Sequence, residues 1–214
     1  MPYNLDAFSF DDNRDDRQFA RWYSHPAELL PSETVSEDIL FKTGSTNDGD
    51  SNVVECQNQT INLPKGNYNK LYILDAADED TQGDLKIDGQ SCTFKVQQGT
   101  GYVGQFYYRV LTPDNNDVVK IIEPYTKRDD IAWYASHKHI AYPSKNDSYQ
   151  YCYIYKYEID LPQDAQKVTL PDNKMIKIFA MTVAKVANED ARILQPLYDD
   201  FKENQHIHLR NNNN

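Results

Sequence analysis

Five tyrosines occupy every second position between residues 149 and 157 of this chain. Successive side chains of a β-strand point to opposite faces, so a spacing of two places all five rings on one face of one strand. Aromatic side chains fill a pleated, half-buried surface well. The spacing therefore predicts a strand over residues 149–161 with its tyrosine face packed on a core. The five are Tyr149, Tyr151, Tyr153, Tyr155 and Tyr157.

A second extended segment carries a tryptophan and two histidines at odd-numbered positions. On a single strand, Trp133, His137 and His139 would share one face. With Asn146 and Tyr149 from the segment that follows, these rings and the amide suit the recognition of sugar hydroxyls. The alternative is a purely structural histidine pair, whose buried rings would both need hydrogen-bond partners.

The rest of the chain reads as short strands separated by turn residues. Asp88-Gly89 joins two such runs and is typical of a two-residue β-hairpin. Helical periodicity is weak, and short helical turns are expected only near residues 28–30 and 191–201. Strands are expected at residues 71–74, 85–87, 92–96, 118–122, 131–139, 149–161, 167–170 and 174–183.

This pattern predicts an all-β fold, either an antiparallel β-sandwich or a jelly roll. A chain of 214 residues fits one large β domain, which we expect over residues 1–201. The asparagine-rich end, residues 202–214, is expected to be a disordered tail or a linker.

Charge and composition exclude several classes of function. The net charge is −11 and the isoelectric point about 4.8, which argues against nucleic-acid binding because that needs a concentrated cationic surface. No apolar run is long enough for a membrane helix, and no signal peptide begins the chain. The three cysteines, Cys56, Cys92 and Cys152, match neither a disulfide framework nor a zinc ribbon, although one bridge and a free thiol would be compatible with their number.

Asp11, Asn13 and Asp15 place oxygen ligands at alternate positions, as the start of an EF-hand loop does. The motif then fails, because Asp16 replaces the turn glycine and Trp22 replaces the bidentate glutamate. Calcium is the ion that an irregular loop of this kind would bind. The alternative, which the broken motif favours, is a solvated acidic turn.

The histidine pair also raises the question of zinc. His137 and His139 supply two ligands, but a zinc site needs three or four. His25, Asp147 or Cys152 would have to fold nearby to complete it, and their spacing gives no support. We therefore rank zinc, and with it a zinc-dependent hydrolase, below sugar binding and below a structural pair.

Catalysis by this chain has little support in the sequence. Ser136 and His137 are neighbours, and neighbouring strand residues point to opposite faces, so they are not expected to form a catalytic triad. The 33 acidic residues offer too many carboxylate pairs to single out a glycosidase pair. We expect a non-enzymatic module.

Several blocks of the sequence resemble the β-sandwich region that follows the catalytic part of many bacterial family 38 α-mannosidases. The resemblance implies a galactose-binding-like jelly roll, an accessory domain attached to or derived from a glycan-processing enzyme. It also places Arg109 close to the histidine strand, as a secondary ligand candidate. The matching blocks are residues 3–6, 27–31, 61–66, 70–74, 130–139, 146–157, 159–162, 169–173 and 176–180.

The sequence thus leads to two hypotheses. The first is a non-catalytic, carbohydrate-associated β-sandwich that binds a glycan or glycoprotein and works beside a catalytic glycosidase domain. It would act outside the cell or in the secretory compartment if the chain is part of a longer secreted protein. The second is a structural docking module with no ligand of its own, whose aromatic rows pack against another domain or subunit.

Overall fold

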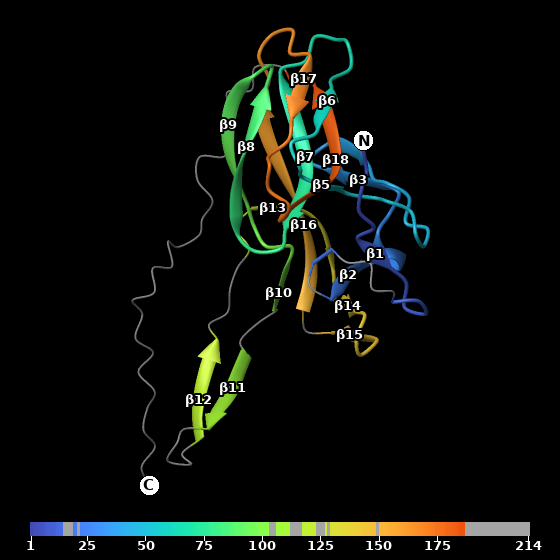
Figure 1. Ribbon diagram of the computed structural model, residues 1–214, viewed down its shortest axis with the longest axis vertical. Coiled ribbons are helices and arrows are strands. Elements are labelled where there is room, and N and C mark those ends of the chain that lie inside the picture. The colour runs from blue at the N-terminus through green and yellow to red at the C-terminus, as the bar shows by residue number, and fades with distance from the viewer. Residues whose placement is uncertain are drawn as a thin grey trace.

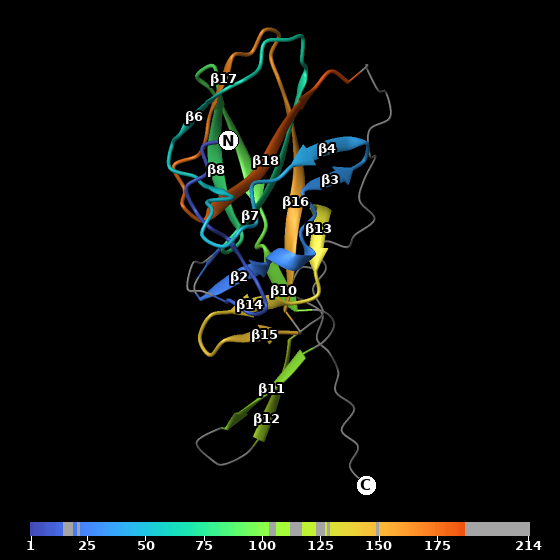
Figure 2. The same ribbon diagram turned by 90° about the vertical axis from the view of Figure 1, so that its right-hand side faces the viewer.

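The computed structural model describes residues 1–14, 19–20, 22–102, 106–111, 117–122, 127, 129–148 and 150–186. Its largest sheet runs through the middle of the molecule (Figures 1 and 2). In order, that sheet contains β10 (Thr100–Tyr102), β16 (Gln150–Asp160), β7 (Lys70–Ala77), β18 (Ile176–Ala184) and β5 (Val54–Glu55), and β13 (Asp130–Ala135) also pairs with β16.

β7 is buried on both faces, which explains its nearly continuous apolar sequence. Leu71 and Ile73 point into one hydrophobic cluster, whereas Tyr72 and Leu74 point into a second. The alternation of a strand thus divides a single apolar run between two cores. Both faces of the central sheet must therefore be covered.

The first core is closed by a four-stranded antiparallel sheet. Its β8–β9 hairpin turns at Asp88 and Gly89, whose φ angles of 47° and 90° are those of the expected two-residue turn. The sheet contains, in order, β6 (Thr60–Asn62), β17 (Lys167–Thr169), β8 (Thr81–Ile87) and β9 (Gln90–Val96).

The second core is closed by a smaller sheet and a separate hairpin. Figure 1 shows β2, β14 and β15 beside the lower end of β16, whereas β8, β9 and β17 lie beside its upper end. The elements are β1 (Phe8–Ser9), β2 (Tyr23–Pro26), the 3-10 helix η1 (Ala27–Leu29), β14 (Lys138–Ile140), β15 (Lys145–Asp147), and the hairpin of β3 (Glu33–Ser36) with β4 (Ile39–Lys42).

These sheets confirm the expected all-β, antiparallel β-sandwich. Most strand pairs are antiparallel, and β1 with β2 is a parallel exception. A further hairpin joins β11 (Phe106–Leu111) to β12 (Asp117–Ile122). Among the described residues, no helix is long and apolar enough to cross a membrane. The predicted helical turn at residues 191–201 and the predicted tail lie outside the described residues.

The expectation of one strand over residues 131–139 is wrong. β13 ends at Ala135, and β14 begins at Lys138 in a different sheet. A register shift between Ile131 and Trp133 marks a bulge in the pairing of β13 with β16. The break lets β14 pair with β2 on one side and β15 on the other, so its backbone groups gain two partner strands.

One carboxyl group lies in the first core. Asp75 of β7 is fully buried, and neither of its carboxyl oxygens has a hydrogen bond to the described residues. Burial, and secondarily the charge of Asp129, raises the pKa of Asp75 well above its ordinary value. The native state therefore favours the neutral acid.

This burial predicts a particular pH dependence for Asp75→Asn. Because the pKa of Asp75 is raised by folding, its contribution to stability is complete below the unfolded pKa of about 4 and falls as the pH rises toward the folded pKa. The variant should gain free energy of unfolding over the parent at pH 8 and lose that gain near pH 4, as measured by urea denaturation. Asp84→Asn, at an exposed position on β8, is the control. Equal curves for the two variants would contradict the assignment.

Candidate functional site

The break between β13 and β14 carries His139 to the edge of the second core. His139 pairs with Ser24 of β2 and with Asn146 of β15, and its side chain is fully buried. Its Nδ1 lies 2.9 Å from the Ser9 hydroxyl, which in turn lies 2.5 Å from the Ser24 hydroxyl. The Nδ1 edge of the imidazole is thus held by Ser9, whose hydroxyl in turn contacts Ser24.

His137 lies beside it, in the connection that precedes β14. The two ring centroids are 5.2 Å apart at an interplanar angle of 32°. The Nδ1 of His137 lies 3.2 Å from the hydroxyl of Ser136. The Nε2 atoms of both histidines are buried and lack a hydrogen bond to the described residues. Two imidazoles therefore present the same type of nitrogen atom to one region.

Two carboxylates complete a four-residue cluster. Asp11 comes from the turn after β1, and Glu28 comes from η1. The Nε2 of His139 lies 3.2 Å from Asp11 Oδ1 and 3.4 Å from Glu28 Oε1. One ligand atom from each of Asp11, Glu28, His137 and His139 lies within 4.8 Å of the others. Three separate segments of the chain, the turn after β1, η1 and residues 137–139, therefore meet at one point.

Arg14 and Asn146 both donate hydrogen bonds to Asp11. Arg14 Nη2 donates to Asp11 Oδ1 at 2.6 Å, and Asn146 Nδ2 donates to the same oxygen at 2.8 Å. Arg14 also donates to Asn146 Oδ1 through Nε at 2.8 Å. The predicted ligand residue Asn146 thus lies next to the histidine pair, in a network that orients a carboxylate.

The electrostatics of the cluster favour neutral imidazoles. Burial lowers the pKa of His139 to about 4, with further lowering by Arg14 and His137, and burial also lowers the pKa of His137. Burial raises the pKa of Glu28, and the nearby Asp11 adds to that effect. A hydrogen bond from Asn146 lowers the pKa of Asp11. Neutral imidazole nitrogens suit transition metals such as zinc, which also accepts carboxylate oxygens as ligands.

Trp133 does not belong to this surface. It is only 8% exposed and packs in the second core, and its indole Nε1 donates to the backbone oxygen of Leu29 at 3.0 Å. The expectation that it would share an open face with His137 and His139 is wrong, because the bulge in β13 turns the indole inward and β14 belongs to another sheet.

The other proposed zinc ligands also lie elsewhere. His25 is fully buried and packs against Phe19, Trp133 and Phe179 at ring distances of 4.5, 5.9 and 5.6 Å. Burial lowers its pKa to about 3, whereas the backbone of Tyr153 acts in the opposite direction. The four-residue cluster contains neither Asp147, nor Cys152, nor His25.

The residues proposed for calcium separate in the structure. Asp11 faces the histidines, whereas Asn13 Nδ2 donates to Asp48 Oδ2 at 2.8 Å. Asp15 and Tyr149 lie outside the described residues, as does the side chain of Arg109. The premise that Ser136 and His137 are neighbours on one strand was wrong, because both lie in the connection between β13 and β14, where the Ser136 hydroxyl reaches the His137 ring.

The tyrosine row confirms the predicted half-buried face of β16. Tyr155 is fully buried, whereas Tyr151 and Tyr153 are partly exposed. On the adjacent β13, Tyr134 is 63% exposed, and its ring is nearly parallel to that of Tyr151, at 4° and a centroid distance of 6.3 Å. The Lys127 ammonium lies 5.3 Å from the ring centroid of Tyr153. The row therefore ends in an exposed aromatic surface, here called the tyrosine face: Tyr134, Tyr151 and Tyr153.

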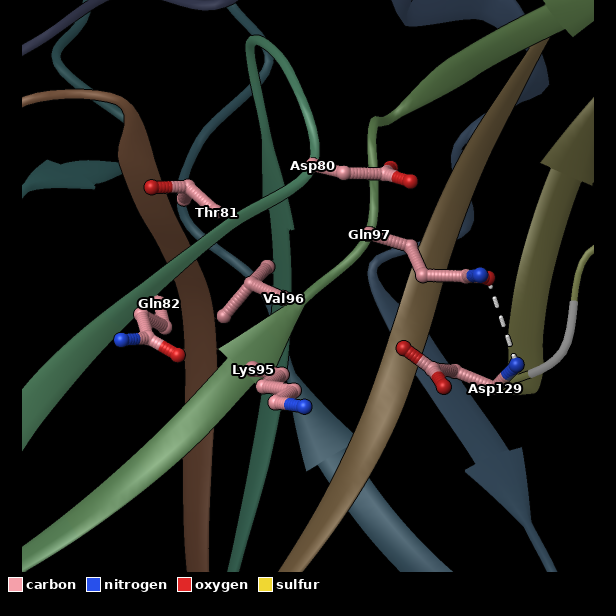
Figure 3. Close-up of a pocket in the computed structure, with 7 residues that line it drawn as sticks. All are labelled: Asp80, Thr81, Gln82, Lys95, Val96, Gln97 and Asp129. Atoms are coloured by element: carbon pink, nitrogen blue, oxygen red, sulfur yellow. Dashed lines mark hydrogen bonds between the residues drawn. The ribbon is translucent and has the colours of Figure 1, made fainter.

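An open, polar cleft of about 540 Å³ lies between the β8–β9 hairpin and the start of β13. Figure 3 shows Gln97 directed toward Asp129, whose backbone nitrogen donates to Gln97 Oε1 at 3.3 Å. No member of the histidine cluster lines this cleft. Its lining residues are Asp80, Thr81, Gln82, Lys95, Val96, Gln97 and Asp129.

A family model described as an AziU2-like beta-sandwich domain matches residues 1–187 of the chain. No curated protein matches it. The family match agrees with the β-sandwich part of the resemblance seen in the sequence, and the relation to mannosidases remains a hypothesis.

The position of Trp133 predicts its energetic role. Trp133→Ala should lower the free energy of unfolding by about 3–5 kcal/mol, as expected when a large buried aromatic side chain is removed. Tyr134→Ala, on the opposite face of the same strand, should cost far less because its ring is largely exposed. Chemical denaturation measures both. A small effect at Trp133 would show that the indole is not part of the core.

Proposed function

The chain belongs to the AziU2-like beta-sandwich domain family, and from that fold we propose that it acts as a non-catalytic binding module. The proposed ligand is a glycan, alone or on a glycoprotein, and the proposed contact surface is the tyrosine face. The observation that carries the proposal is the nearly parallel arrangement of Tyr134 and Tyr151, with Tyr134 63% exposed. An exposed aromatic surface of this kind needs an explanation, because burying rings against a partner is strongly favourable.

A sugar suits this surface for two reasons. The flat face of a tyrosine ring packs against the C–H groups of a pyranose, and its hydroxyl offers a hydrogen bond at the edge. A neutral ligand also avoids repulsion by a chain of net charge −11.

A catalytic role has weaker support. Ser136 and His137 touch, but they are sequence neighbours in the connection before β14, and the second nitrogen of His137 faces a histidine and carboxylates. These surroundings resemble a set of metal ligands. In a catalytic triad, by contrast, a carboxylate orients the histidine ring so that it can accept the serine proton. Action beside a glycosidase domain is part of the proposal because the mannosidase resemblance implies it. If the chain is part of a longer secreted protein, the proposed place of action is outside the cell or in the secretory compartment.

A docking module is the second candidate, and a specific observation favours it. Large apolar side chains are exposed on η1, on the β3–β4 hairpin and on β13, and β3 lies against β13. Several exposed apolar side chains on adjoining elements are unusual for an isolated soluble domain. They are Leu29, Val35, Leu40 and Ile131, here called the apolar patch.

Glycan binding is tested by a glycan array followed by titration of the best-retained glycan. Tyr134→Ala and Tyr151→Ala should each weaken binding by about 3–10-fold, since an aromatic contact contributes about 0.5–1.5 kcal/mol beyond its buried area. Tyr142→Ala is the matched control, because Tyr142 is 83% exposed but lies outside the tyrosine face. The proposal fails if no glycan is retained, or if both variants bind as tightly as the parent.

Docking through the apolar patch is tested by sedimentation over a range of protein concentrations. The isolated chain should self-associate, and Val35→Lys should reduce that association because it places a charge in the patch. Met175→Lys is the control, because it also replaces an exposed apolar side chain but lies outside the apolar patch. It should have no effect on self-association. A chain that stays monomeric at all concentrations would argue against this candidate.

A further inference from the structure

We propose that Asp11, Glu28, His137 and His139 form a binding site for one zinc ion. The site is separate from the tyrosine face, and the proposal does not depend on glycan binding. It rests on the four donor groups that the fold brings together from three segments of the chain.

The first argument is the orientation of the imidazoles. A metal-binding histidine usually engages its other ring nitrogen in a hydrogen bond, which fixes the tautomer and aims the lone pair at the metal. His139 meets this requirement, because Nδ1 contacts the Ser9 hydroxyl and Nε2 is buried without a hydrogen bond to the described residues. His137 has the same arrangement, with Ser136 in the role of Ser9. An unpartnered buried nitrogen is costly unless something binds it.

The second argument is distance. Tetrahedral ligands that lie about 2.0–2.1 Å from zinc are about 3.3 Å from one another. His139 Nε2 lies 3.2 Å from Asp11 Oδ1 and 3.4 Å from Glu28 Oε1, close to that edge length. The same nitrogen makes no acceptable hydrogen bond to either oxygen. A nitrogen that lies close to two oxygens without a hydrogen bond to either is the arrangement expected when all three atoms bind one metal ion between them.

The third argument is charge. Asp11 and Glu28 bring two carboxylates to the same small region, where a cation relieves their mutual repulsion. The positive charge of Arg14 partly neutralises Asp11, and the hydrogen bonds from Arg14 and Asn146 fix its carboxylate in place. Such hydrogen bonds to a ligating carboxylate are typical of the outer shell of metal sites.

The donor set selects the ion. Calcium takes six to eight oxygen ligands, and magnesium also prefers oxygens. Two imidazole nitrogens with two carboxylate oxygens suit zinc and its neighbours in the first transition row. Bound zinc would connect the turn after β1, η1, the β13–β14 connection and β14 itself. Because the unfolded chain does not assemble this set, zinc should stabilise the native state.

The experiment is calorimetric titration of the full, untagged chain with zinc after chelator treatment, in parallel with calcium. His206 and His208, together with the exposed Cys92, could also bind zinc. A reference chain with Cys92→Ser, His206→Ala and His208→Ala therefore serves as background. We expect one zinc ion per chain in both proteins, a rise in melting temperature with zinc, and much weaker binding of calcium.

The ligand variants are made in the reference chain. His139→Ala and His137→Ala should each weaken zinc binding by more than the ~10–100-fold typical of outer-shell changes, and Ser9→Ala by about that amount. Glu28→Gln keeps the size of a partly exposed side chain, so it tests the ligand role without removing buried volume. Asp12→Asn, next to Asp11 but outside the cluster, should leave binding unchanged. Circular dichroism of the metal-free proteins verifies folding.

Three results would overturn the proposal. Zinc binding that disappears in the reference chain would assign the ion to the C-terminal histidines or to Cys92. Equal affinity of folded Glu28→Gln and Asp12→Asn would remove Glu28 from the site. Calcium binding as tight as zinc binding would contradict the nitrogen–oxygen donor set. The tetrahedral absorption bands expected of the cobalt-substituted chain would support it, and octahedral bands would count against it.

Discussion

The pairing of β14 with β2 is the constraint on which the histidine cluster depends. It places His139 opposite Ser24, within reach of Ser9, and brings the turn after β1 and η1 to the same edge of the second core. If residues 131–139 continued as one strand along β16, His139 would belong to the central sheet and would lie away from Asp11 and Glu28. A local break of a strand therefore creates the chemical site.

The fold tolerates this break because the central sheet, which does not contain β14, packs against both hydrophobic cores. β7 is buried on both faces, and β16 and β18 flank it along most of its length. The aromatic cluster of Phe19, His25, Trp133 and Phe179 then fills the space between that sheet and β2. His25 is a core residue there, and His139 lies at the rim, although both belong to neighbouring strands of one small sheet.

Local patterns in the sequence predicted the local features well. The period of two at Tyr151–Tyr157, the Asp88-Gly89 turn and the apolar run of β7 all follow from side-chain alternation and turn chemistry, and the structure confirms them. His137, His139 and Asn146 were singled out, and they do lie together. Trp133 was misplaced because a bulge and a strand break leave no clear mark in composition.

The partners of the histidines could not be predicted from the sequence. Asp11 was singled out as a calcium ligand together with Asn13 and Asp15, not as a partner of the histidines, and Glu28 was not singled out as a ligand at all. They lie more than a hundred residues before His137, and no local spacing connects them. Such contacts follow from sheet order, which depends on packing over the whole domain. The tyrosine face was foreseen only in part: the row on β16 follows from its spacing, but Tyr134 of β13 and the exposure of this surface were not predicted.

The most direct test of the zinc assignment is anomalous X-ray scattering at the zinc edge from crystals grown with one equivalent of zinc. The account predicts a single strong peak at bonding distance, about 2.0–2.2 Å, from the Nε2 atoms of His137 and His139 and from a carboxylate oxygen of Asp11 and of Glu28. A peak at other residues, or no peak between the two histidines, would contradict it.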